Sequence, residues 1–140
     1  MKILLAVDGS VYTKQMLAYV AAHDELLGPE HEYTLFTVVA PVPPHAARYL
    51  DRQTLDEYYR EQAEEVFKPL RTFAGQQGWK VRLLHTAGHA ADDIAEVAEK
   101  EKCDLIVMGT RGHSSLGNLV LGSVATGVLA RSKKPVLLIR

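Results

Sequence analysis

The chain has one cysteine, almost no net charge and no long hydrophobic run, and each scarcity excludes a class of protein. A single thiol, Cys103, cannot close an internal disulfide or hold a metal ion among several thiolates. The apolar run 3–7 ends at a carboxylate and is shorter than the core of a secretion signal or a membrane-spanning helix. We therefore expect a cytoplasmic protein in which Cys103 is a small buried hydrophobic residue.

The charges nearly cancel. A net charge of −1, from 16 basic and 17 acidic residues, gives little attraction for nucleic acid or for acidic membranes. Apolar residues make up 47% of the sequence and charged residues 24%, which excludes an intrinsically disordered chain. A length of 140 residues is typical of one domain and is enough to bury a core without disulfides or metals. We expect one domain over residues 1–140.

Short apolar runs alternate with segments of helical periodicity. Parallel strands joined by right-handed helical crossovers give a sheet with helices on both faces, so the pattern predicts a doubly wound α/β fold. Strands are expected at 3–7, 33–40, 79–85, 104–108 and 135–140, and helices at 16–27, 51–77, 91–100 and 123–130.

The helix expected at 51–77 carries two further expectations. Pro69 predicts a kink or a break, because proline cannot donate a helical hydrogen bond. The aromatic side chains of Tyr58, Tyr59 and Phe67 are expected to face the core. The segment 41–45 before this helix is either a lid over a ligand or a stiff surface loop.

Two segments at expected strand ends carry residues suited to chemistry. Asp8 follows the first strand, and its carboxylate either serves a ligand or caps the next helix. The glycine-rich segment 109–123 follows the fourth strand and leads into a helix. Glycines let backbone N–H groups converge on an anion, and a helix start adds free amides. Arg111 and His113 offer further donors, and this combination is what a phosphate site requires. The alternative is a flexible glycine loop, which glycine content alone would favour.

Two common phosphate motifs are absent. A Walker loop needs a lysine before its final serine or threonine, and no lysine lies between Gly117 and Ser123. A dinucleotide fingerprint needs several glycines after the first strand, where Gly9 stands alone. The sequence therefore favours neither a P-loop nucleoside triphosphatase nor an ordinary dinucleotide-dependent dehydrogenase.

Four features of the sequence resemble the universal stress protein family. They are the spacing Gly-x2-Gly-x9-Gly-Ser at Gly109, Gly112, Gly122 and Ser123, the block 103–113, the opening run 3–10 and the closing run 135–139. The resemblance spans the whole chain. It implies an adenine nucleotide α-hydrolase-like fold with five parallel strands in the order 3-2-1-4-5. It further implies a ligand crevice between strands 1 and 4, ATP (or ADP or AMP) as ligand, and a homodimer through the last strand, Val136–Ile139.

The resemblance also implies residue roles. Asp8 would lie near the ribose or near a phosphate-bound Mg²⁺ or Mn²⁺ ion. Ala6 and Val7 would line the base pocket, and the backbone of Val38, or of Val39 in the other register, would meet the adenine edge. The residues expected against the ribose are Met108 and Gly109, and those expected to cradle the phosphates are Gly112, Gly122, Ser123 and Val124. Phosphate contacts by Arg111 and His113 are a hypothesis from loop geometry.

Three functions remain open from the sequence. The first is an ATP-binding stress protein that acts as a nucleotide-dependent sensor or regulator. Its ATP hydrolysis would be slow at most, because no general base or water-positioning group is evident near Ser123. The second is a genuine ATPase or nucleotide hydrolase, and the third is an interaction module that needs no nucleotide.

Overall fold

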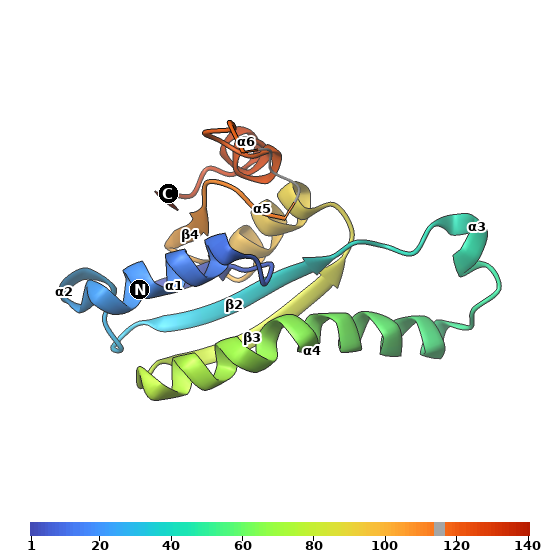
Figure 1. Cartoon of the computed structure of the whole chain (residues 1–140), viewed down its shortest axis with the longest axis horizontal. Helices are drawn as coiled ribbons and strands as arrows, with labels where there is room; N and C mark the ends of the chain where they lie inside the picture. Colours follow the sequence, from blue (N-terminus) through green and yellow to red (C-terminus); the bar gives the residue numbers. More distant parts are fainter. Residues whose placement is uncertain (114–116) are drawn as a thin grey trace.

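The computed structural model describes residues 1–113 and 117–140 and contains one five-stranded parallel sheet (Figure 1). The strands follow the order β3-β2-β1-β4-β5, which confirms the expected order and fold class. Each strand lies within two residues of its expected limits. The strands are β1 (Lys2–Ala6), β2 (Glu32–Val39), β3 (Lys80–Ala87), β4 (Leu105–Gly109) and β5 (Val136–Ile139).

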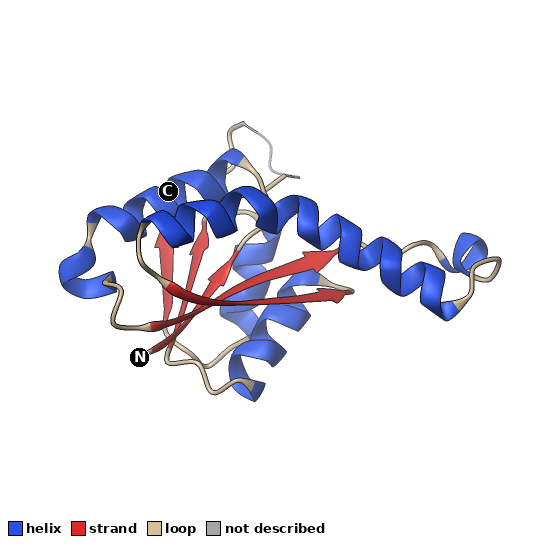
Figure 2. Ribbon diagram, turned by 90° about the horizontal axis from the view of Figure 1, so that it is seen from below, coloured by secondary structure: helices blue, strands red, loops and turns tan. Residues whose placement is uncertain are grey.

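Six helices connect the described strands and cover both faces of the sheet (Figure 2). They are α1 (Val11–Ala22), α2 (Asp24–Leu27), α3 (Pro44–Ala47), α4 (Arg52–Gln76), α5 (Ala90–Lys100) and α6 (Ser123–Arg131). The single helix expected at 16–27 is wrong, because His23 separates α1 from α2 with non-helical backbone angles. Its ring lies 2.8 Å from the carbonyl oxygen of Tyr19, near the end of α1.

The helix α4 continues through Pro69, so the break expected there is wrong. Pro69 is exposed, so water can reach the carbonyl group that loses its helical donor. On either side of it, Phe67 and Leu70 are buried against the core. Packing of this apolar side therefore holds the helix together across the proline.

The strand β1 is buried on both faces. Ile3 and Leu5 belong to a core cluster with residues of α1 and α4, whereas Leu4 belongs to a second cluster with residues of α5 and α6. Successive side chains of a strand point to opposite faces, so a doubly covered strand is hydrophobic throughout. The continuous apolar run at 3–7 therefore identified this central strand.

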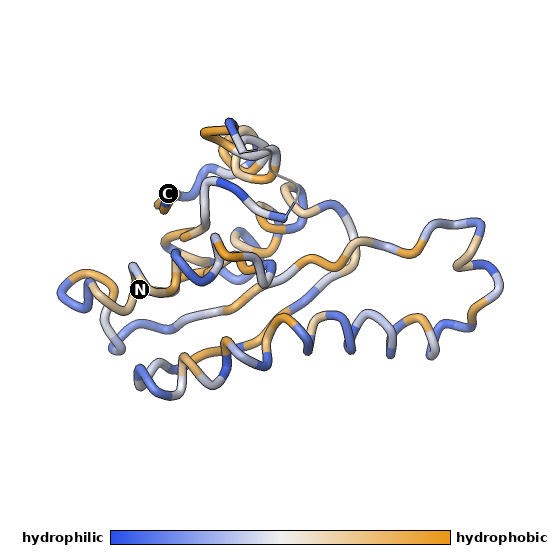
Figure 3. The backbone as a smooth tube through the Cα atoms, in the orientation of Figure 1, coloured by the Kyte–Doolittle hydropathy of each residue, from blue (hydrophilic) through white to orange (hydrophobic). Residues whose placement is uncertain are grey.

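The first half of α4 projects beyond the sheet together with α3 (Figure 1). Hydrophilic and hydrophobic residues alternate along α4 (Figure 3), but its buried residues begin only at Ala63, near the middle of the helix. Phe67 is buried as expected, Tyr59 is half-buried and Tyr58 is exposed, so the core-facing prediction is wrong for Tyr58. The segment 41–45 ends in α3, a short helix that the sequence did not predict.

The single thiol lies inside the second core cluster. Cys103 is buried, which confirms its expected place, and this burial, with the charge of Glu101, raises the pKa of the thiol. In the described part of the chain, no helix is both long and apolar enough to cross a membrane.

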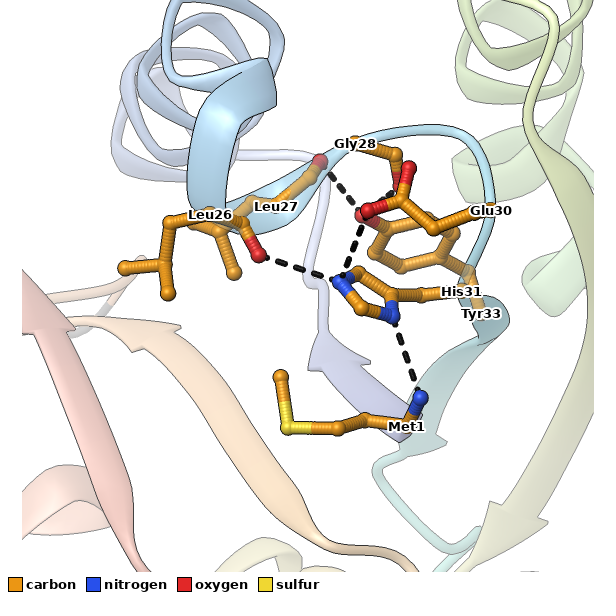
Figure 4. A network of polar contacts seen from close by, with 7 residues as sticks. All are labelled: Met1, Leu26, Leu27, Gly28, Glu30, His31 and Tyr33. Carbon is orange, nitrogen blue, oxygen red and sulfur yellow. Dashed lines mark hydrogen bonds and ion pairs between the residues drawn. The ribbon is translucent and has the colours of Figure 1, made fainter.

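A polar network joins the connection after α2 to the start of the chain (Figure 4). The buried Tyr33 hydroxyl lies 2.5 Å from the carbonyl oxygen of Leu27 and 2.7 Å from that of Gly28, and donates to them. The His31 ring accepts from the Met1 amino group at 3.0 Å and donates to the Leu26 carbonyl at 3.0 Å, in the tautomer that satisfies both contacts. Burial, with the charge of Glu30, raises the pKa of Tyr33 to about 12.

Replacing Tyr33 by phenylalanine is expected to lower the free energy of unfolding by about 1–2 kcal/mol at pH 7, because the two carbonyl groups lose their donor. The raised pKa means that the folded chain keeps its phenol proton where the unfolded chain loses it. Stability from this group is therefore lost as pH rises from about 10 towards 12. Urea denaturation should show the gap between the two proteins narrowing over that range. Tyr19→Phe, at an exposed tyrosine, is the control, and an equal loss in both variants would contradict the prediction.

Candidate functional site

A cavity of about 490 Å³ opens at the carboxyl ends of β1 and β4. The chain leaves β1 towards α1 and leaves β4 towards α6, which lie on opposite faces of the sheet. Such a divergence leaves an uncovered crevice between the two strand ends, where ligands bind in sheets of this kind. The structure brings all twelve predicted binding residues to this cavity: Ala6, Val7, Asp8, Val38, Met108, Gly109, Arg111, Gly112, His113, Gly122, Ser123 and Val124.

Alternate residues at the end of β2 line the cavity. Val38 and Ala40 line the cavity, whereas Val39 packs against the core cluster on the other face. The alternation of side chains along a strand accounts for this difference. Eight other lining residues were not predicted: Thr13, Phe36, Ala40, Ala90, Ile94, Thr110, Leu119 and Ala125. Three of them lie in or just after the glycine-rich segment, and the other five come from separate parts of the chain. Strand alternation from Val38 would have found Phe36 and Ala40, but no local signal marks Ala90 or Ile94.

Asp8 is held by hydrogen bonds from the start of α1. Its Oδ1 accepts from the Ser10 N–H at 2.9 Å and from the Thr13 hydroxyl at 2.8 Å, and the Asp8 N–H donates to that hydroxyl oxygen at 3.0 Å. Ser10 itself caps the helix, accepting from the Thr13 N–H at 3.4 Å. Of the two readings of Asp8, direct capping is therefore wrong.

The pKa of Asp8 reflects two opposing effects. Partial burial alone raises the pKa, but the hydrogen bonds from Ser10 and Thr13 and the nearby His113 together lower it below its ordinary value. The carboxylate is thus ionised at neutral pH and places a negative charge at the cavity wall.

The glycine-rich loop lies against Asp8. The His113 N–H donates to Asp8 Oδ2 at 3.3 Å, and the His113 ring lies 2.5 Å from the Asp8 carbonyl oxygen, to which it donates. A side chain at Gly112 would bring its Cβ within 2.5 Å of Asp8 Oδ2. Glycine is therefore required at 112 for the loop to approach the carboxylate so closely. Residues 114–116 of this loop lie outside the described part of the chain.

A second close approach occurs where the loop enters α6. The Gly122 N–H donates to the Thr110 carbonyl at 2.6 Å, and a Cβ at Gly122 would lie 3.1 Å from that oxygen. The backbone angles of Gly122, φ −73° and ψ 167°, suit any residue, so lack of space rather than backbone conformation favours glycine here.

The amino end of α6 faces the cavity. Ser123 and Val124 line it, and the helical hydrogen bonds begin with Thr126, whose N–H donates to the Gly122 carbonyl at 3.0 Å. The amides before Thr126 have no acceptor within their own helix. They and the helix dipole favour an anion at this end of the cavity.

The two basic residues of the loop already have contacts. The Arg111 guanidinium lies over the Tyr12 ring, 4.7 Å from its centroid, and the His113 ring lies against the Asp8 backbone. Both line the cavity. The Arg111 guanidinium brings a positive charge to a cavity that is also lined by apolar side chains, among them Val38, Ile94 and Met108. The cavity thus suits a ligand with a flat apolar group and an anionic group.

The whole chain, residues 1–140, matches the family model described as "Universal stress protein family". A universal stress protein of Thermus aquaticus is 37% identical over 140 residues, which cover 99% of this chain and 97% of that protein. The solved structure of a Methanocaldococcus jannaschii protein is similar, with a TM-score of 0.78 and 28% identity over 99% of this chain and 94% of the other.

Two more distant solved structures share the fold and contain an adenine nucleotide. One is a universal stress protein in complex with cAMP, with a TM-score of 0.63 and 22% identity over 100% of this chain and 96% of the other. The other, a family member from Arabidopsis thaliana, has AMP bound, with a TM-score of 0.70 and 14% identity over 99% of this chain and 90% of the other. At these identities the likeness is one of fold.

Replacing Asp8 by asparagine is expected to lower the free energy of unfolding by about 1 kcal/mol at pH 7, because the donors of Ser10, Thr13 and His113 lose a charged acceptor. The lowered pKa means that the carboxylate stabilises the fold above its unfolded pKa. That contribution is lost as pH falls through the folded pKa. The gap between wild type and variant should therefore shrink below about pH 4.

Urea denaturation at pH 7 and pH 3 measures this gap. Glu96→Gln removes an exposed carboxylate from α5 and serves as the matched control. A gap for Asp8→Asn that is the same at both pH values would contradict the account of Asp8.

Proposed function

Because this chain belongs to the universal stress protein family, we propose that it binds ATP in the cavity between β1 and β4 and acts as a nucleotide-dependent regulator. The observation that carries the proposal is the meeting of an apolar wall with a loop and helix end rich in backbone N–H groups. A nucleotide has the matching parts, a flat base and a phosphate chain. The cAMP and AMP held by two proteins of this fold support the adenine class of ligand.

The lining of the cavity supports one orientation for the proposed nucleotide. The base would lie against Val38 and Ile94, within reach of the β2 backbone, and the ribose against Met108. The phosphates lie towards Gly112, Gly122 and the first amides of α6. In the proposed complex, Arg111 contributes positive charge beside them and His113 lies next to them as a further donor.

The residues present also fit a phosphate-bound Mg²⁺ or Mn²⁺ ion. Magnesium prefers carboxylate oxygens together with substrate phosphates and water. Asp8 Oδ1 is occupied by Ser10 and Thr13, while Oδ2 accepts a longer bond from His113 and faces the loop. Asp8 Oδ2 is therefore the protein atom that would hold the ion, which would partly neutralise the phosphate charge.

We expect ATP hydrolysis in this site to be slow. The carboxylate at the cavity wall is Asp8, and its lowered pKa makes it a weak proton acceptor. The remaining proposed phosphate contacts are backbone amides and positive charges, which hold phosphates without activating a water molecule. The role that fits is a nucleotide-dependent change of state rather than turnover.

The substitution Gly122→Val tests the site. The new side chain meets the Thr110 carbonyl and displaces the loop, so affinity for ATP with magnesium is expected to fall at least about tenfold in calorimetric titration. The stability cost is expected at about 1–3 kcal/mol, within what a folded domain tolerates.

The matched control is Gly75→Val, which adds the same side chain on α4, where a Cβ meets open space. It should bind ATP as the wild type does. If the folded, nucleotide-stripped wild type binds no ATP, the proposal fails and the chain is an interaction module. Rapid ATP turnover that Asp8→Asn abolishes would instead favour a hydrolase.

We also propose a homodimer formed through β5. The sheet has two edge strands, and exposed charged residues, Lys80 and Arg82, protect β3 against pairing. The sequence of β5, Val-Leu-Leu-Ile, has no charged residue, and three of its four residues are only partly buried. An apolar edge of this kind favours pairing with the same strand of a second copy about a twofold axis.

Light scattering at micromolar concentration is expected to give the mass of two chains. Val136→Lys should reduce it to one chain, because a charge on an edge strand opposes pairing. Val81→Lys makes the same change at a similarly half-buried valine of β3 and should leave the mass unchanged. A single-chain mass for the wild type would refute the dimer.

A further inference from the structure

The helices α5 and α6 make one unusually close contact, between Ala91 and Gly127. A Cβ placed on Gly127 would lie 2.5 Å from the Ala91 Cβ, far inside the usual separation of about 3.5–4.0 Å between carbon atoms. Glycine inside a helix costs about 1 kcal/mol relative to alanine, so its place here has a packing reason. The helix separation at this point therefore requires that one of the two residues have no side chain.

A polar contact lies beside this close approach. Arg131, at the end of α6, forms an ion pair with Asp92 in the first turn of α5 and donates to the Gly127 carbonyl at 3.1 Å. The His89 ring lies 3.1 Å from the other oxygen of Asp92. These side chains are partly exposed, so their contacts add little to the free energy of unfolding and mainly orient the side chains between the two helices.

Of the two helices, α5 is the more firmly anchored. Its residues Ala91, Ile94 and Ala98 are buried in the second core cluster, and the Thr86 hydroxyl of β3 donates to Asp93 at 2.7 Å. The helix α6 is shorter and packs mainly against α5. A larger side chain at this contact would therefore displace α6 rather than α5.

Gly127 lies about one helical turn from the amino end of α6, where Ser123 and Val124 line the cavity. We propose that the Gly127–Ala91 contact is a positioning device that sets where the free amides of α6 meet the phosphate groups. Gly127 does not line the cavity and acts through α6. The inference rests on the proposed nucleotide site and names the residue pair that tunes it for phosphate.

The substitution Gly127→Ala tests this inference, with ATP plus magnesium and adenosine as the two probes in calorimetric titration. Displacing α6 removes amide contacts to phosphate but leaves the apolar base wall in place. ATP affinity is therefore expected to fall about tenfold, which corresponds roughly to the loss of one hydrogen bond to a charged group. Adenosine affinity is expected to change less than about twofold. Gly75→Ala, where a Cβ meets open space, is the control.

The double variant Gly127→Ala/Ala91→Gly moves the methyl group from one helix to the other and removes the clash. It should recover ATP affinity to within about threefold of wild type. Ala91→Gly alone introduces no clash and only removes the support of α6, so it tests the same contact if Gly127→Ala fails to fold. It should weaken ATP binding about threefold and spare adenosine.

The outcomes separate the two proposals. A wild type that binds neither ATP nor adenosine refutes the nucleotide site itself. If the wild type binds ATP, two results for the single variants overturn the positioning role. In one, the single variants bind ATP as well as the wild type does. In the other, their affinities for ATP and for adenosine fall to the same extent. Failure of the folded double variant to recover ATP affinity overturns it as well.

Discussion

The rest of the structure depends on β1 being buried between β2 and β4. Because the strands on its two sides are reached by helices on opposite faces, the connections after β1 and β4 run apart and leave the crevice open. The same burial keeps polar side chains out of the strand interior, where Leu4 and Leu5 are fully buried in opposite clusters. In β1 and β4 the polar side chains are therefore confined to the ends of the strands or just beyond them, where Asp8 and Thr110 lie.

Asp8 illustrates how the protein itself holds a charged side chain in place at the edge of the cavity. Its backbone and Oδ1 are tied to Thr13 and Ser10, so the carboxylate cannot turn away from the cavity without breaking several hydrogen bonds. The loop then rests on the other oxygen, which requires that residue 112 have no side chain. One carboxylate thus orders the start of α1 and the glycine-rich loop together, so a substitution there is expected to affect stability as well as the cavity.

The sequence was informative wherever a feature is local. Short apolar runs predicted the strands, and the family resemblance, carried in part by the glycine spacing, predicted twelve binding residues that all line one cavity. It failed where tertiary contacts decide: His23 interrupts a helical pattern, core packing carries α4 across Pro69, and Tyr58 projects beyond the sheet. The contact between Gly127 and Ala91 was equally invisible, because the distance between two helices is set by their packing and not by either helix alone.

The composition of the cavity also bears on why a protein of this kind would hold ATP without consuming it. Backbone amides and positive charges that bind phosphate equally well in the ground state and the transition state lower the dissociation constant but do not accelerate the reaction. Asp8 would be a weak acceptor for a proton from water, because its pKa is lowered and its carboxylate already accepts hydrogen bonds. It would therefore accelerate hydrolysis little. What binding can change is the position of α6, since this short helix meets the proposed phosphates at one end and α5 along its length. A nucleotide held there would couple its phosphate chain to the packing of two helices, and such a coupling is what a regulator requires.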